Sequence, residues 1–135
     1  MTKSFIKKVT TTQKKKTPRT HQFEAILSVV KGFEKTDRGQ LIMACGTGKT
    51  LTSLWIKEKL KSGRTLILFP SLSLISQSLK EWQAESNQDL NWICVCSDKT
   101  VAREKDAWVD NASDLGIPVT NDVETIAEFL VKTPD

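Results

Sequence analysis

Residues 43–50 combine glycine, lysine and threonine at a spacing that can bind a nucleotide phosphate. They read Met-Ala-Cys-Gly-Thr-Gly-Lys-Thr. Gly46 and Gly48 let the backbone turn its N–H groups toward phosphate oxygens, and a helix N-terminus adds a positive dipole. Lys49 can reach the β- and γ-phosphates, and the Thr50 hydroxyl can ligate a bridging Mg²⁺. ATP and Mg²⁺ are the expected ligands, and Lys49 and Thr50 are the expected catalytic groups. The residues of the loop expected to bind the nucleotide are Cys45, Gly46, Thr47, Gly48, Lys49 and Thr50.

The flanking sequence has the elements that such a loop requires. Residues 39–44 predict a short buried strand, and residues 49–62 predict a helix that stops at Gly63. The strict phosphate-loop pattern has glycine where this chain has Met43, so the pattern is met in its second half. A chance surface turn would not be expected to have an apolar strand before it and an apolar helix after it.

The rest of the chain alternates between helical and strand patterns. Apolar residues at helical spacing predict helices over residues 23–33, from residue 71 to beyond Trp82, and from about residue 121 to just before Pro134. Asn121 and Glu124 resemble a capping box for the last helix. Continuous apolar runs predict strands at 65–69 and 91–96. The predicted fold class is therefore α/β, with a parallel sheet covered by helices on both faces.

Composition limits the class of protein. The chain has 135 residues, of which 39% are hydrophobic and 27% charged, which is typical of one globular domain. No apolar run is long enough to span a bilayer and no signal peptide is evident, so a cytoplasmic protein without membrane contact is expected. Cys45, Cys94 and Cys96 are expected to be reduced thiols, since their spacing suits neither a disulfide framework nor a zinc site.

Charge is concentrated at the N-terminus. Residues 1–23 carry +7 and the remainder −3, because no acidic residue precedes Glu24. Residues 1–17 are predicted to form a basic tail before a domain at 18–135. The tail can bind DNA through counterion release or can simply be a solvated segment.

The loop resembles that of superfamily 2 helicase-like ATPases, which commonly have Ala or Met in place of the first glycine. This resemblance implies a RecA-like domain. Pro18-Arg-Thr-His-Gln22 is similar to the segment with which restriction-type members hold adenine, so Arg19 and Gln22 are the implied base contacts. The Gln22 amide can both donate and accept, although a glutamine at a helix start can also be purely structural.

Residues 69–77 follow a predicted strand at the place where these motors contact the DNA backbone. Pro70, Ser71 and Ser73 are the implied contacts, because serine hydroxyls can donate to phosphate oxygens. A simpler interpretation is that Pro70 and Ser71 cap the helix, and both roles are compatible.

Residues 95–98 and 113–120 resemble, in order and spacing, the helicase-like segment of type ISP restriction-modification enzymes. The resemblance covers residues 18–135 and implies a DNA-translocating ATPase that is part of a longer polypeptide. Double-stranded DNA and the remainder of that polypeptide are therefore the implied partners.

The hydrolytic groups of that class are not evident. Such ATPases need a strand-end Asp-Glu pair to organise Mg²⁺ and water, and none follows Asp98. The later carboxylates are expected to be solvated: Asp106, Asp110, Asp114, Asp122 and Glu124. The chain is therefore interpreted as an incomplete first motor domain, derived from an ATP-hydrolysing enzyme but not catalytic in isolation.

Two other functions remain open at this stage. A small-molecule kinase shares the phosphate loop, but Met43 and Phe69-Pro-Ser71 argue against it. A non-catalytic scaffold that binds nucleic acid through its basic arm would show no ATP-dependent signal, so nucleotide titration separates it from a motor.

Overall fold

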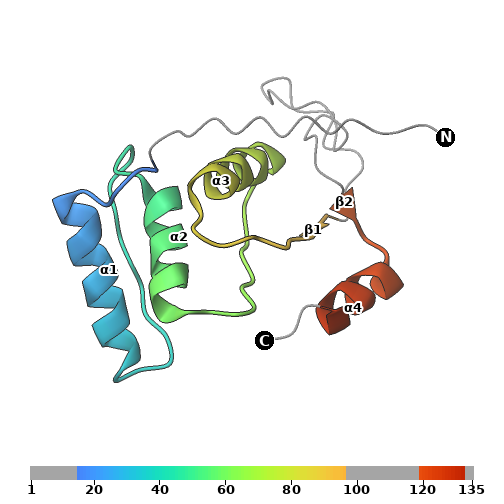
Figure 1. The fold of residues 1–135 in the computed structure, drawn as a ribbon, viewed down its shortest axis with the longest axis horizontal. Helices are drawn as coiled ribbons and strands as arrows, with labels where there is room; N and C mark the ends of the chain where they lie inside the picture. The colour runs from blue at the N-terminus through green and yellow to red at the C-terminus, as the bar shows by residue number, and fades with distance from the viewer. Residues whose placement is uncertain (1–14, 97–118, 133–135) are drawn as a thin grey trace.

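The computed structural model describes residues 15–96 and 119–132. In Figure 1 the earlier helices pack together, and a short strand pair leads to the last helix. The order is α1 (Thr20–Phe33), α2 (Lys49–Leu60), α3 (Leu72–Glu85), β1 (Cys94–Val95), β2 (Val119–Thr120) and α4 (Val123–Lys132). All four predicted helices are confirmed, and the α/β class holds in its coarse form, with helices and a parallel strand pair.

The core lies where α1, α2 and α3 meet. Its buried cluster consists of Ile26, Leu51, Leu54, Trp55 and Trp82. Leu54 and the neighbouring Thr52 are fully buried. Burying a large apolar side chain stabilises a fold by about 1.5–3 kcal/mol. The cluster therefore fixes α2, and with it the loop that precedes α2.

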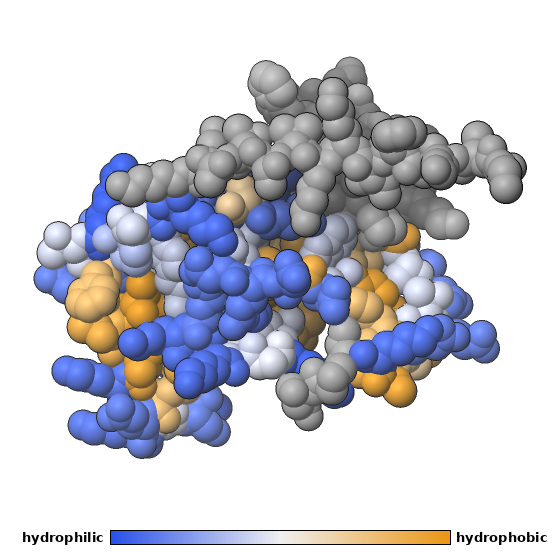
Figure 2. Space-filling view, in the orientation of Figure 1, coloured by the Kyte–Doolittle hydropathy of each residue, from blue (hydrophilic) through white to orange (hydrophobic). Residues whose placement is uncertain are grey.

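Apolar side chains also remain on the surface. Phe23 and Phe33 belong to the predicted apolar face of α1, yet they are 55% and 46% exposed. On α4, Val123 and Val131 are exposed as well. Figure 2 shows these apolar areas over the α1–α2 end of the molecule and over α4. The described part of the chain thus has more apolar surface than its own core covers.

The end of α2 differs from the prediction. The helix ends at Leu60, and Lys61, not Gly63, takes the left-handed conformation with φ 53°. Its backbone N–H donates to the Glu58 carbonyl oxygen at 3.2 Å, and the Ser62 N–H donates to that of Lys57 at 3.2 Å. These bonds satisfy carbonyl groups of the last turn and offset the cost of a left-handed lysine.

Two predicted strands are not formed. Residues 39–44 and 65–69 have no strand assignment, and Ile42, Leu66 and Leu68 are more than 80% exposed. A strand requires a hydrogen-bonded neighbour, and neither segment has one among residues 15–96 and 119–132. The prediction of strands here is wrong for the described residues, because an apolar run forms a strand only where another segment pairs with it.

The third predicted strand, at 91–96, is present in shortened form. Cys94 and Val95 of β1 pair in parallel with Val119 and Thr120 of β2. The Cys96 N–H extends the pairing by donating to the Thr120 carbonyl oxygen at 3.3 Å. Of the motif-like segments at 95–98 and 113–120, residues 97–98 and 113–118 lie outside the described ranges.

Asp122, not Asn121, caps α4. The backbone N–H and the hydroxyl of Thr125 donate to Asp122 Oδ2 at 2.8 and 2.6 Å. These two bonds, that of the hydroxyl first, hold the pKa of the Asp122 carboxyl below its ordinary value. Asp122 and Glu124 are exposed, as expected for surface carboxylates, whereas Asp98, Asp106, Asp110 and Asp114 lie outside the described residues.

Within the described ranges, no helix is long and apolar enough to cross a membrane.

Candidate nucleotide-binding site

The loop at residues 43–50 adopts the backbone conformation that its glycines permit. Gly46 and Gly48 have φ angles of 75° and 81°, in the region that favours glycine. Gly48 is the N-cap of α2, and its carbonyl oxygen accepts the first helical bond from the Thr52 N–H at 3.0 Å. The N–H groups of the first turn therefore have no partner within the helix. The loop ends at a helix N-terminus that can receive an anion.

The Lys49 side chain lies across the loop. Its ammonium donates to the carbonyl oxygens of Ala44 at 2.9 Å and Met43 at 3.3 Å. The Thr47 hydroxyl also donates to the Ala44 carbonyl oxygen, at 2.7 Å. Lys49 is exposed, so its ammonium can exchange these carbonyl contacts for a phosphate oxygen.

Thr50 lies on the first turn of α2 and is half-buried. Its carbonyl oxygen accepts bonds from two side chains besides the helix: the Ser53 hydroxyl at 2.8 Å and the Trp82 indole N–H at 2.8 Å. The first turn is therefore held by α3 as well as by its own helix. Nothing in the sequence pattern indicated this contact, because the two residues are 32 positions apart.

Gln22 lies against the loop. It is buried, with 5% exposure. Its side-chain N–H donates to the carbonyl oxygens of Thr47 at 3.1 Å and Gly48 at 3.4 Å, and its Oε1 accepts the Arg19 N–H at 2.9 Å. The structure therefore brings the predicted base-contact segment directly onto the phosphate loop and gives Gln22 a role in holding that loop.

The residues beside Gln22 are more open than Gln22 itself. His21 Nε2 is 3.2 Å from the Thr47 carbonyl oxygen on the exposed side of α1. The Arg19 side chain is exposed. Cys45 is exposed in the loop as well, whereas Cys94 is buried in β1, where burial and the neighbouring Cys96 raise the pKa of its thiol.

The chain's own groups fit a Mg²⁺-nucleotide. A phosphate needs converging N–H donors and a cation, and the left-handed glycines, the start of α2 and Lys49 provide them. A Cβ on Gly46 would meet nothing within 4 Å, so the space beside this residue is open. A Cβ on Gly48 would lie 2.5 Å from Gln22 Nε2. Glycine at position 48 is therefore what allows Gln22 to approach the loop.

The predicted DNA contacts lie elsewhere, at the start of α3. Pro70, Ser71 and Ser73 are exposed, and the two serine hydroxyls are 3.1 Å apart. Ser71 is also the N-cap, since its hydroxyl accepts the Leu74 N–H at 3.4 Å. From Ser71 to Trp82 the helix rises about 16 Å. The structure thus does not bring these residues to the loop; it connects them to the loop through α3.

The segment before α1 is tied to the other end of α3. The backbone N–H of Lys16 donates to Glu85 Oε2 at 2.7 Å, and its ammonium is 3.6 Å from Glu85 Oε1. The Lys15 ammonium donates to the Ser86 carbonyl oxygen. Sequence reasoning placed both lysines in a tail, and no local pattern could have revealed contacts across about 70 residues.

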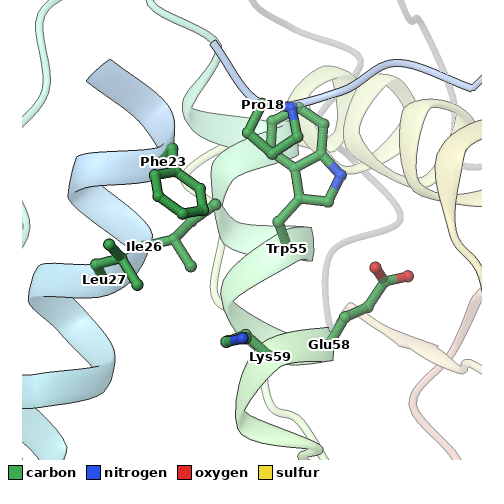
Figure 3. A pocket seen from close by; sticks show the side chains of 7 residues that line it. All are labelled: Pro18, Phe23, Ile26, Leu27, Trp55, Glu58 and Lys59. Carbon is green, nitrogen blue, oxygen red and sulfur yellow. The ribbon is translucent and has the colours of Figure 1, made fainter. Parts of the chain in front are cut away.

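A groove lies between α1 and α2. Figure 3 shows Phe23, Ile26 and Leu27 of α1 facing Trp55 of α2. Its volume is about 300 Å³, and Pro18, Glu58 and Lys59 complete its lining. None of these residues belongs to the loop at 43–50, although Pro18 belongs to the segment that leads into α1.

Known proteins resemble this chain over most of its length. A family model described as "Type III restriction enzyme, res subunit" matches residues 15–126. A solved structure of a nuclease-deletion mutant of the Type ISP restriction-modification enzyme LlaGI, in complex with a DNA substrate mimic, is 34% identical with a TM-score of 0.65. It matches 87% of this chain, which spans 11% of that one.

A second structure shares the same description of enzyme type. It is the ATP-dependent Type ISP restriction-modification enzyme LlaBIII bound to DNA, which is 31% identical with a TM-score of 0.70. The match covers 91% of this chain and 8% of that one. No curated protein sequence shows significant similarity.

Proposed function

We propose a function on the premise that the chain belongs to the type III restriction enzyme res subunit family. The resemblance of its motifs to restriction-type helicase-like ATPases is confirmed by this match and by the two Type ISP structures. The proposed function is to bind ATP within a DNA-dependent ATPase that translocates on DNA in a restriction-modification system. Hydrolysis would depend on further parts of a longer polypeptide.

The loop geometry is the observation that carries this proposal. Left-handed glycines lead into α2, and Lys49 follows directly. In the proposed complex the N–H groups of residues 46–50 and the Lys49 ammonium hold the phosphates. The Thr50 hydroxyl would ligate Mg²⁺, which would neutralise phosphate charge. Before a phosphate can bind, Lys49 must leave the carbonyl oxygens of Met43 and Ala44.

The base would be held by the segment that leads into α1. Gln22 Oε1 accepts one bond from the Arg19 N–H and keeps a second lone pair. That lone pair can accept from the exocyclic amino group of adenine, whereas guanine has an acceptor at the corresponding position. Arg19 is exposed beside it and can contact the base or the ribose.

DNA is the proposed macromolecular partner. Both similar enzymes were solved with DNA or a DNA mimic. The exposed hydroxyls of Ser71 and Ser73 at the N-terminus of α3 can donate to backbone phosphates, with Pro70 shaping the turn.

Further polypeptide is the proposed partner of the extended segments 39–44 and 65–69. Their exposed apolar side chains, Ile42, Leu66 and Leu68, are typical of strands buried on both faces of a parallel sheet. Strands from the remainder of the motor would pair with these segments and complete a RecA-like sheet. The same remainder would supply an acidic pair for hydrolysis.

Competition between ATP and GTP tests the proposed function. The chain is expected to bind Mg²⁺-ATP saturably and to prefer it to Mg²⁺-GTP. Gln22→Ala should lower the ATP/GTP affinity ratio about tenfold, because the lost bond reads the base. Its contacts to Thr47 and Gly48 affect both nucleotides alike and cancel in the ratio. Fluorescence titration measures both affinities.

His21→Ala is the matched control, because His21 also contacts the carbonyl oxygen of Thr47. The ATP/GTP affinity ratio of this variant should stay near the wild-type value. An unchanged ratio in Gln22→Ala would remove the adenine contact from this residue. If the wild-type chain bound neither nucleotide, the proposed function itself would be wrong.

The N-terminal arm is expected to contribute to DNA binding through its charge. Replacing Lys3, Lys7, Lys8 and Lys14 together by glutamine leaves the Lys15 and Lys16 contacts to α3 in place. The plot of log affinity against log salt concentration should become less steep by up to about 3.5, since each lost phosphate contact removes about 0.9. Fluorescence anisotropy with a short duplex at several salt concentrations measures this slope. An unaltered slope would make the arm a passive segment.

A further inference from the structure

Helix α3 touches the nucleotide site at its phosphate end. The Trp82 indole N–H donates to the Thr50 carbonyl oxygen at 2.8 Å. Trp82 is 7% exposed and belongs to the core cluster. Its ring is thus fixed by packing, and a fixed donor restrains the acceptor that it meets. Thr50 is the residue whose hydroxyl the proposed function assigns to Mg²⁺.

The same helix touches the base end of the site. Glu85 accepts the Lys16 backbone N–H at 2.7 Å and pairs with its ammonium. The Glu85 side chain is 12% exposed and that of Lys16 62%, so the backbone N–H bond to a largely buried carboxylate, more than the solvent-screened ion pair, fixes this contact. Two residues after Lys16, the chain enters the segment from Pro18 to Gln22. The contact between Lys16 and Glu85 therefore fixes the position at which the base-contact segment begins.

The two contacts are separate in sequence and chemistry. One joins α3 to α2 through a neutral indole donor, and the other joins α3 to the residues before α1 through a carboxylate. They lie within one turn of each other near the C-terminal end of α3. A single rigid helix thereby reaches both ends of the loop's binding site.

We propose that α3 is the positioning element of the nucleotide site, with Trp82 as the positioning residue for its phosphate end and Glu85 for its base end. The inference rests on the proposed function. Trp82 holds the first turn of α2 so that the Thr50 hydroxyl meets the metal. Glu85 holds Lys16 so that Arg19 and Gln22 meet the base. Neither residue touches the nucleotide.

Two substitutions separate these roles. Trp82→Phe keeps an apolar ring in the cluster and removes the donor. The Mg²⁺ gain is the ratio of ATP affinity with Mg²⁺ to ATP affinity in EDTA. Trp82→Phe should reduce this gain by roughly three- to tenfold, the effect of one hydrogen bond. ATP affinity in EDTA and the ATP/GTP affinity ratio should stay near wild type. Glu85→Ala should lower the ATP/GTP ratio by a similar factor and leave the Mg²⁺ gain unchanged.

Matched controls come from the same elements. Trp55→Phe shortens a second tryptophan in the same cluster, with 8% exposure. Glu81→Ala removes a carboxylate of α3 whose bond is to Gln77 of the same helix. Both controls should keep the wild-type Mg²⁺ gain and ATP/GTP ratio. Thermal unfolding without nucleotide checks that Trp82→Phe and Trp55→Phe remain folded to the same extent.

Equilibrium titration of ATP and GTP, each with Mg²⁺ and with EDTA, decides the question on the whole chain. The inference is supported if Trp82→Phe lowers only the Mg²⁺ gain, Glu85→Ala lowers only the ATP/GTP affinity ratio, and neither control changes either quantity. It is overturned if Trp82→Phe matches Trp55→Phe, if Glu85→Ala matches Glu81→Ala, or if both readouts move together in either variant. A wild-type chain that binds no nucleotide would instead remove the proposed function, and this inference with it.

Discussion

Lys49→Ala is expected to weaken Mg²⁺-ATP binding by roughly ten- to a hundredfold. The substitution removes a charge-assisted contact to the phosphates worth about 1.5–3 kcal/mol. The ammonium also donates to Met43 and Ala44, so its loss loosens the loop before any ligand arrives. Both effects lower affinity, and isothermal titration calorimetry measures their sum.

Lys59→Ala is the control for this substitution. It removes the same charge from an exposed position on α2, about two and a half turns beyond the loop. Its affinity should remain within about twofold of wild type, because solvent and salt screen a charge at that distance. Equal affinity in Lys49→Ala and Lys59→Ala would show that the loop does not hold the phosphates.

Gly48→Ala is expected to destabilise the loop by about 2–4 kcal/mol and to abolish most nucleotide binding. A left-handed conformation costs a residue with a Cβ about 1–2 kcal/mol. The new Cβ would also lie 2.5 Å from Gln22 Nε2. Because Gln22 is buried, moving its amide breaks the bonds to Thr47 and Gly48 and costs a further ~1–2 kcal/mol.

Gly46→Ala separates the cost of backbone strain at a positive φ from the cost of displacing the Gln22 side chain. Its φ is also positive, at 75°, but a Cβ there would meet nothing within 4 Å. In the absence of nucleotide, the melting temperature should fall more for Gly48→Ala than for Gly46→Ala. Equal losses would mean that the contact between Gln22 and the loop contributes nothing to stability.

Local patterns predicted the helices well, because each depends on its own residues. The apolar spacing of α1 and α3 and the serine cap at Ser71 are readable without knowledge of the rest of the fold. Errors arose where two neighbouring residues could serve one role. Lys61 ends α2 ahead of Gly63, and Asp122 caps α4 in place of Asn121.

The strands were harder to predict for a physical reason. An apolar run becomes a strand when another segment pairs with it, and pairing is not a property of the run itself. Residues 94–95 find that partner in β2, whereas residues 39–44 and 65–69 find none within the described ranges.

The backbone conformation of the loop at residues 43–50 could be predicted almost completely, and the contacts that support the loop could not. The glycines, Lys49 and the start of α2 follow from eight consecutive residues. The contacts from Trp82 to Thr50 and from Lys16 to Glu85 join residues 32 and 69 positions apart. Such contacts depend on how the helices pack, which periodicity does not specify.

Residue-resolved nuclear magnetic resonance tests the central claim most directly. With 15.1 kDa, the isotope-labelled chain can be titrated with Mg²⁺ and a non-hydrolysable ATP analogue while its amide signals are followed. We predict that the largest shifts occur at the backbone amides of Gly46, Thr47, Gly48, Lys49 and Thr50 and at the side-chain amide of Gln22. No saturable shift, or shifts confined to residues away from the loop, would contradict the account.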